Sequence, residues 1–227
     1  FLREDERISL DYAIRRTHFD GLDLIPANLR LFQSEYELAA RMARGQGALL
    51  DRLQHGIASI ADRYDIVVID PPPALGAISL SVLRAANALV VPVPPTVMDF
   101  SSTAAFLAML DETMQVLTEH GMDTDLAFLR FVASKVDENK SMQKELMRLM
   151  KQLYGQSLVR TPLKDSAEID NASARLMTVY ELEGPTTSRS VRDRCLTYLD
   201  GVNSEIEVDI RSMWPSHEAR LRREGLA

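Results

Sequence analysis

Short runs of branched apolar residues alternate with longer amphipathic segments along this chain. The runs at residues 21–26, 64–70, 88–93 and 126–134 have the character of strands, and the three later ones suit a sheet buried on both faces. Helical periodicity predicts helices at residues 34–62, 76–86, 99–119, 139–154 and 188–212, with an interruption of the first at residues 45–47. Strands alternating with helices predict an α/β fold, with a mostly parallel twisted sheet covered by helices on both faces.

The composition fits one domain. The chain has 227 residues, of which 46% are hydrophobic and 26% charged, and it contains no repeat, low-complexity tract or Gly/Ser-rich linker. We therefore expect residues 1–227 to form a single domain, with residues 188–214 as its C-terminal helix. The single Cys195 allows no internal disulfide, which is typical of a cytoplasmic protein. No apolar run approaches the roughly 20 residues that span a bilayer, and residues 1–7 resemble neither a signal peptide nor an anchor.

The run at residues 64–70 ends in Asp70 and is followed by three prolines, Pro71 to Pro73. Open α/β sheets bind ligands at the carboxyl ends of their strands, so Asp70 is expected at a ligand-binding edge. A carboxylate there can hold a water of a Mg²⁺ shell and orient the ion against phosphate oxygens. The alternative is that Asp70 only caps the following helix. The proline-rich ending favours the first interpretation, because it makes a rigid turn that can report phosphate occupancy.

Residues 64–76, Tyr-Asp-Ile-Val-Val-Ile-Asp-Pro-Pro-Pro-Ala-Leu-Gly, and residues 83–93, Leu-Arg-Ala-Ala-Asn-Ala-Leu-Val-Val-Pro-Val, together carry a family resemblance. They resemble ParA-type partition ATPases, which are relatives of MinD in the deviant Walker A group of P-loop proteins, and Asp70 matches the Walker B position. Residues 21–29 resemble the Leu-Ile-Pro-x-Asn strand and turn of the family. Residues 199–207 and Trp214 are similar to the C-terminal helix of the RepA subgroup of plasmid partition proteins. The resemblance covers nearly the whole chain and is most specific over residues 64–95.

The resemblance implies a P-loop NTPase-like fold, ATP and Mg²⁺ as cofactors, a nucleotide-dependent homodimer, and binding of DNA without sequence preference. It also implies a ParB-type centromere-binding partner that stimulates hydrolysis, no membrane association, and a cytoplasmic, nucleoid-associated location. Asp70 then organises Mg²⁺ through a water as the catalytic residue. Pro72 and Pro73 form a switch that couples the γ-phosphate to the dimer interface.

One part of the family pattern is missing from these 227 residues, namely the Lys-Gly-Gly-x-Gly-Lys-Thr phosphate loop. No lysine precedes Lys135, and Gly45-Gln46-Gly47 lacks the lysine and lies in a helical context. We therefore expect an ATPase domain truncated at its N-terminus, which does not hydrolyse ATP by itself. The alternative is a non-catalytic remnant that keeps the fold and binds a partner.

Base contact is expected at a second strand end. Residues 126–134 lead into Lys135 and Asp137, and in P-loop relatives this strand end and a later loop surround the adenine base. Residues 161–164 resemble that later loop, which makes Pro162 a candidate as well. Lys135 and Asp137 can equally be an ordinary surface pair.

DNA binding by a chain of net charge −7 needs a local basic patch. On a helix at 139–154 four cations fall within about an 80° arc at ~100° per residue, with apolar residues such as Met142, Leu149 and Met150 on the opposite side. The cations are Lys140, Lys144, Arg148 and Lys151. A second candidate group begins the last helix and contains Arg189, Arg192 and Arg194. Neither has interleaved aromatic residues, so contact is expected to be electrostatic; the alternative is a solvated charged face.

Other classes fit less well. One cysteine is too few for the cluster of the nitrogenase iron protein, and a dehydrogenase needs a Gly-x-Gly-x-x-Gly loop after a strand. A MinD-like anchor needs a broad apolar face beside its basic one, which Leu221 and Leu226 do not provide. The four histidines have no metal-ligand spacing.

Overall fold

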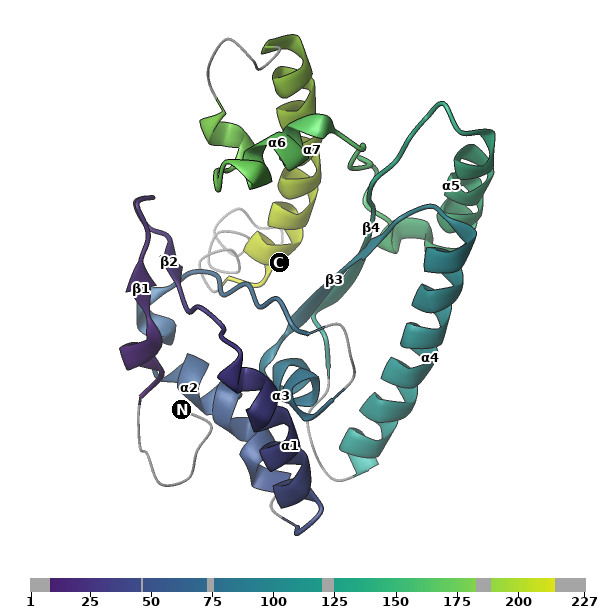
Figure 1. Ribbon diagram of the computed structural model, residues 1–227. Coiled ribbons are helices and arrows are strands. Elements are labelled where there is room, and N and C mark those ends of the chain that lie inside the picture. The colour runs from purple at the N-terminus through teal and green to yellow at the C-terminus, as the bar shows by residue number, and fades with distance from the viewer. Residues whose placement is uncertain (1–8, 46, 73–75, 120–124, 183–188, 215–227) are drawn as a thin grey trace, which may run out of the picture. The chain divides into compact units, whose positions relative to one another are not determined.

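The computed structural model of the chain describes residues 9–45, 47–72, 76–119, 125–182 and 189–214 (Figure 1). The chain forms two compact units. The first contains residues 1–87 and 121–125, and the second contains residues 88–120 and 126–227.

The first unit is mainly helical. A 3-10 helix, η1 (Leu10–Ala13), leads into strand β1 (Arg15–Arg16), which pairs antiparallel with β2 (Asp23–Leu24). The helices α1 (Arg30–Met42), η2 (Gly47–Asp51), α2 (Arg52–Ala58), η3 (Ala61–Arg63) and α3 (Ala77–Ala85) follow. Leu38, Leu49 and Ala77 form a small core that joins α1, η2 and α3. An ion pair of 2.7 Å between Arg84 and Asp51 ties α3 to the end of η2.

The second unit contains a parallel pair of strands, β3 (Ala88–Val93) and β4 (Phe128–Ala133), in register from Ala88 opposite Phe128 to Val93 opposite Ala133. Between them runs α4 (Val97–Glu119), and after them come α5 (Ser141–Tyr154), η4 (Gly155–Ser157), α6 (Ala167–Ala174), η5 (Val179–Glu181) and α7 (Arg189–Ser212). Side chains of successive strand residues point to opposite faces, so each face meets different helices.

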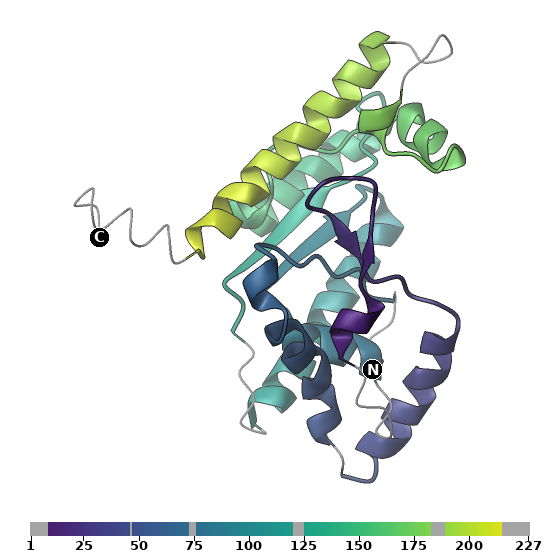
Figure 2. The ribbon, with the colours of Figure 1, turned by 90° about the vertical axis from the view of Figure 1, so that its left-hand side faces the viewer.

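Helices cover both faces of this strand pair (Figures 1 and 2). On one face Val93 and Phe131 pack with Phe100 of α4 and Met150 of α5, and Met150 is fully buried. On the opposite face Val132 packs with α7. A third cluster joins α6, η5 and α7 around Leu182 and Cys195. The predicted fold class, α/β with a parallel sheet, is confirmed.

Most of the predicted elements are present with small shifts of their ends. Helix α4 begins two residues before the predicted start, α5 and α7 lie within the predicted ranges, and strand β3 coincides with residues 88–93. The predicted helix at 34–62 is confirmed as α1, η2, α2 and η3, with the turn at Gly45, whose φ of 81° lies in the left-handed region. The strand predicted within 21–26 is only two residues long and antiparallel. Helix α6 lies in a part of the chain for which no element was predicted.

The strand predicted at residues 64–70 is wrong in this structure. Residues 64–72 have no strand partner among the described residues, and Ile66, Val67 and Val68 are 45%, 46% and 90% exposed. A strand needs neighbours that satisfy its backbone groups and layers that cover its faces. The described part of the first unit offers one short hairpin, which pairs with itself. Apolar character alone therefore does not make this segment a strand.

Candidate functional site

Asp70 lies in the unpaired segment before α3. Its carboxylate is exposed and makes no hydrogen bond or ion pair with the described residues. Two residues later the carbonyl of Pro72 accepts a hydrogen bond from the Ser79 hydroxyl at 3.4 Å, which attaches the segment to α3. Pro73 lies outside the described residues. The alternative role of Asp70 as a cap of α3 is not what the structure contains, because another carboxylate holds that position.

The N-terminus of α3 is capped by Glu35 of α1. One carboxylate oxygen accepts from the backbone N–H of Ala77 at 2.5 Å, and the other from that of Ile78 at 3.0 Å. Gly76 is the N-cap residue, and a Cβ added there would lie 2.1 Å from the Glu35 carboxylate. The positive end of the α3 dipole further stabilises the negative charge of the Glu35 carboxylate. Sequence reasoning missed this contact, because about 40 positions separate Glu35 from Gly76; the glycine beside a helix start was its only local signal.

The surroundings of Asp70 show whether it is suited to bind Mg²⁺. No group of three or more His, Cys, Asp or Glu residues that could hold a metal ion occurs in the described parts of the chain. Magnesium, however, is commonly bound by one or two carboxylates together with water and substrate phosphates. The Asp70 carboxylate can therefore supply one ligand of such a site, and water and substrate phosphates would supply the others.

The other predicted nucleotide contacts converge in the second unit, beyond the carboxyl end of β4. Lys135 is exposed and has φ of 52°, a left-handed conformation that turns the chain at the strand end. The backbone of residues 163–165 forms hydrogen bonds with the segment around this turn. The N–H of Leu163 donates to the carbonyl of Ala133 at 2.8 Å, and the N–H of Val136 donates to the carbonyl of Leu163 at 3.1 Å. The N–H of Asp165 donates to the carbonyl of Val136 at 3.1 Å. Lys135, Asp137 and the loop that carries Pro162 therefore lie beside one another after β4.

Lys135 and Asp137 are not an ion pair with each other. The Asp137 carboxylate accepts from the backbone N–H of Asn139 at 3.0 Å and lies 3.5 Å from the ammonium of Lys140. The pKa of Asp137 is lowered, chiefly by the hydrogen bond from the Asn139 backbone and further by Lys140. Asp137 thus shapes the turn before α5, and Lys135 has no side-chain partner within the described chain.

Helix α5 presents the predicted basic stripe to solvent. Lys144, Arg148 and Lys151 are exposed and have no partner in the described part of the protein, while Lys140 is the member paired with Asp137. The apolar residues on the opposite side of α5 are only partly buried. Met150 is buried against the strands, but Met142, Leu149 and Leu153 are exposed. Three unpaired cations therefore remain on one helical surface.

The arginines at the start of α7 differ from one another. Arg189 is exposed. Arg192 is half-buried and donates to the carbonyl of Leu182 at 2.7 Å, and it also pairs with Asp193 at 3.3 Å. Its guanidinium is thereby engaged in holding the end of η5, which leaves Arg189 as the more accessible cation of the two.

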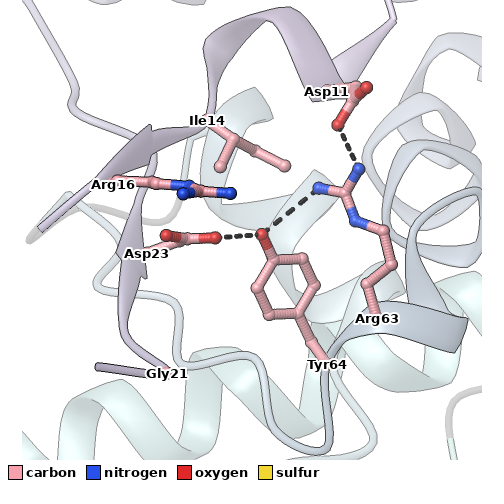
Figure 3. Close-up of a pocket in the computed structure, with 7 residues that line it drawn as sticks. All are labelled: Asp11, Ile14, Arg16, Gly21, Asp23, Arg63 and Tyr64. Carbon is pink, nitrogen blue, oxygen red and sulfur yellow. Dashed lines mark hydrogen bonds and ion pairs between the residues drawn. The ribbon is translucent and has the colours of Figure 1, made fainter. Parts of the chain in front are cut away.

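A cleft of about 550 Å³ lies in the first unit (Figure 3). Within it the Tyr64 hydroxyl donates to Asp23 at 2.6 Å, and Arg63 pairs with Asp11 at 2.6 Å. The lining residues are Asp11, Ile14, Arg16, Gly21, Asp23, Arg63 and Tyr64. Opposite charges are balanced in this lining, and it includes none of the residues predicted to contact nucleotide or DNA.

No helix in the described ranges is both long and apolar enough to cross a membrane.

Comparison with known proteins gives a consistent result. A family model described as an AAA domain matches residues 2–124. The chain is 31% identical over 214 residues to a putative replication protein A of Rhizobium rhizogenes, a match that covers 93% of this chain and 53% of that protein. It is also 29% identical over 138 residues to plasmid partition protein A of Escherichia coli, covering 60% of this chain and 34% of that protein. The chain thus spans about half or less of the length of these two relatives.

Among solved structures, an ATP complex of McdA from Cyanothece superimposes with a TM-score of 0.62. The match is 20% identical in sequence and covers 84% of this chain and 70% of that chain. At this identity the likeness concerns the fold alone.

Proposed function

Because this chain belongs to the ParA/MinD-type family of ATPases, we propose that it acts in the segregation of plasmid DNA as a member of the RepA subgroup. In this proposal it binds ATP and Mg²⁺, forms a nucleotide-dependent homodimer, and binds DNA without sequence preference. Its further partner is a ParB-type centromere-binding protein, and it works in the cytoplasm on the nucleoid. Two findings support the proposal. One relative of this chain is a plasmid partition protein, and McdA, which has a similar fold, has been solved in complex with ATP.

The observation that carries the proposal is the row of unpaired cations on α5. Lys144, Arg148 and Lys151 are exposed and have no partner among the described residues, in a protein with a net charge of −7. Cations in one row can contact successive phosphates along a DNA backbone, and each phosphate contact releases bound counterions. Such binding is independent of base sequence and weakens with salt.

The nucleotide part of the proposal gives each predicted residue a role. Asp70 holds a water of the Mg²⁺ shell, and Pro72 belongs to the segment that responds to the γ-phosphate. Lys135, Asp137 and Pro162 surround the base at the end of β4. Since no lysine precedes Lys135, we expect no ATP hydrolysis by these 227 residues alone. Magnesium-dependent release of phosphate from ATP by the purified chain would contradict this expectation.

Charge reversal on α5 tests the DNA-binding part. In the double variant Lys144→Glu/Arg148→Glu, two phosphate contacts are lost, so the slope of log K against log salt should become less steep by about 2. Affinity for a random-sequence duplex should fall by more than about tenfold at low salt. Fluorescence anisotropy over a series of salt concentrations measures both quantities.

The control is Arg30→Glu/Arg44→Glu, which changes the net charge equally but on the first unit, where both side chains are exposed. If the two double variants weaken binding to the same extent, the overall charge and not the α5 stripe determines DNA affinity, and the proposed site is wrong.

A second candidate function is a non-catalytic remnant that binds a ParB-type protein or an intact ATPase subunit. The exposure of Ile66, Val67 and Val68 favours it, because an unpaired apolar segment is suited to pairing with another chain. A pulldown with a ParB-type partner, run beside an ATP titration, separates the two functions. Partner binding without any response to ATP supports the remnant, and an ATP-dependent response supports the ATPase.

A further inference from the structure

Helix α7 holds the loop at residues 160–164 through one carboxylate, that of Glu205. One of its oxygens accepts from the backbone N–H and the hydroxyl of Thr161 at 2.9 and 2.7 Å. The other accepts from the backbone N–H and the guanidinium of Arg160 at 2.9 and 3.2 Å. A single side chain thereby satisfies two consecutive backbone donors, which fixes both the position and the orientation of the loop.

The same helix approaches the loop closely one turn earlier, at Gly201. A Cβ added there would lie 2.7 Å from Cγ2 and 3.1 Å from Oγ1 of Thr161. Glycine in a helix interior is less stable than alanine by about 0.5–1 kcal/mol, so local propensity opposes this residue. The proximity of Thr161 accounts for its presence.

A third contact extends this face of α7. The ammonium of Lys164 lies 4.5 Å from the ring centre of Tyr198 and pairs with Glu138 at 2.6 Å. Tyr198, Gly201 and Glu205 stand at positions i, i+3 and i+7, which places them on one side of the helix. The loop is therefore held between α7 on one side and the turn after β4 on the other.

We propose that Gly201 and Glu205 are positioning residues that set the 160–164 loop for contact with the base of a purine nucleotide. This inference rests on the proposed nucleotide binding at Lys135, Asp137 and Pro162, and it adds the element that controls it. Neither residue touches the ligand. When the loop is released it samples other positions, and the apparent affinity falls in proportion to the time that the loop spends in the competent one.

Glu205→Gln tests the inference in the 227-residue chain. Titration of the ¹⁵N-labelled protein with Mg²⁺-ATP, followed through the amide signals of residues 135–137 and 160–164, gives the dissociation constant at this edge. The substitution should raise that constant about fivefold to tenfold. It should also bring the ATP-to-GTP affinity ratio closer to one, because in this proposal only the ordered loop discriminates between the two bases. Hydrogen exchange at the amides of Arg160 and Thr161 should become faster. General destabilisation leaves the ratio unchanged.

The matched control is Glu207→Gln on the same helix, where the carboxylate pairs with Arg211 and does not contact the loop. It should leave the ATP dissociation constant and the ATP-to-GTP ratio at their wild-type values.

Steric variants provide an independent test. Gly201→Ala should displace Thr161 and weaken ATP binding to a similar extent as Glu205→Gln. Addition of Thr161→Ser removes the methyl group nearest to the new Cβ and keeps the hydroxyl, so the double variant should recover most of the lost affinity. Failure of the double variant to recover, while Glu205→Gln also has no effect, would overturn the inference.

The outcomes separate the inference from the function on which it rests. If ATP shifts the loop signals equally in wild type and Glu205→Gln, the inference is wrong and nucleotide binding stands. If wild type binds DNA through α5 but ATP leaves the loop signals unchanged, the inference and the base site both fall, while the DNA-binding part remains.

Discussion

Two apolar runs, residues 88–93 and residues 64–70, adopt different structures in this protein. Residues 88–93 form strand β3, in which Val93 is completely buried between α4, α5 and the neighbouring strand. Residues 64–70 form no strand, and Val68 is 90% exposed. The first run has β4 in parallel register beside it, whereas the second has no partner among the described residues. Strand formation here depends on the neighbour supplied by the rest of the chain more than on the run itself.

The largest change in stability is expected from a matched pair of substitutions, one in each run. Val93→Ala should lower the free energy of unfolding by about 2–3 kcal/mol, because it removes two buried methyl groups and leaves a cavity. Val68→Ala should change it by less than about 0.5 kcal/mol, because the side chain is already in solvent. Urea denaturation followed by circular dichroism measures both. Equal losses at the two positions would mean that residues 64–70 are packed in solution as a strand.

The segment after residues 64–70 offers a test of intermediate size. Gly76→Ala forces the Glu35 carboxylate away from the start of α3 and should cost about 1–2 kcal/mol, since two charge-assisted hydrogen bonds are lost. Glu35→Ala should cost a similar amount, and the double variant should cost little more than either single change, because the three variants remove one interaction. Additive losses in thermal unfolding would show that Gly76 and Glu35 act separately.

The smallest expected change in stability concerns Glu205 of α7, which holds the 160–164 loop in the second unit. Burial by itself would raise the pKa of Glu205, but hydrogen bonds from the Arg160 backbone and from Thr161 outweigh it and lower the pKa to about 2. The folded-state pKa thus lies below the unfolded one, so this stabilisation is fully present above about pH 4.5 and is lost as the pH falls toward 2. With solvent screening we expect about 1 kcal/mol.

Acid titration of stability measures this contribution. Glu205→Gln should flatten the loss of unfolding free energy between about pH 4.5 and 2.5, whereas Glu207→Gln should leave the profile like that of wild type. Identical profiles for wild type and Glu205→Gln would show that the carboxylate is not ionised and hydrogen-bonded as described.

The sequence by itself determined the elements whose signals are local. Helices α5 and α7 were predictable because each repeats its apolar residues at helical spacing, over 14 and 24 residues. Helix α4 was predictable from the length of its apolar segment and from the capping residues at its start. Strands β3 and β4 were predictable because an alternating pattern of long helices and short apolar runs selects a parallel sheet. The meeting of Lys135 with the loop of Pro162 also followed, since a family resemblance placed both beside one strand end.

Tertiary structure alone decided the features that join distant residues. The exposure of Val68, the cap that Glu35 provides to α3, and the hold of Glu205 on Thr161 depend on contacts between positions far apart in the chain or on the lack of them. A local pattern records which residues prefer burial or hydrogen bonding, but it does not record which partner reaches them. The same distinction applies to Asp70. Its place after an apolar run is a property of the sequence, whereas the exposure of its carboxylate, which has no partner in the described part of the chain, is a property of the fold.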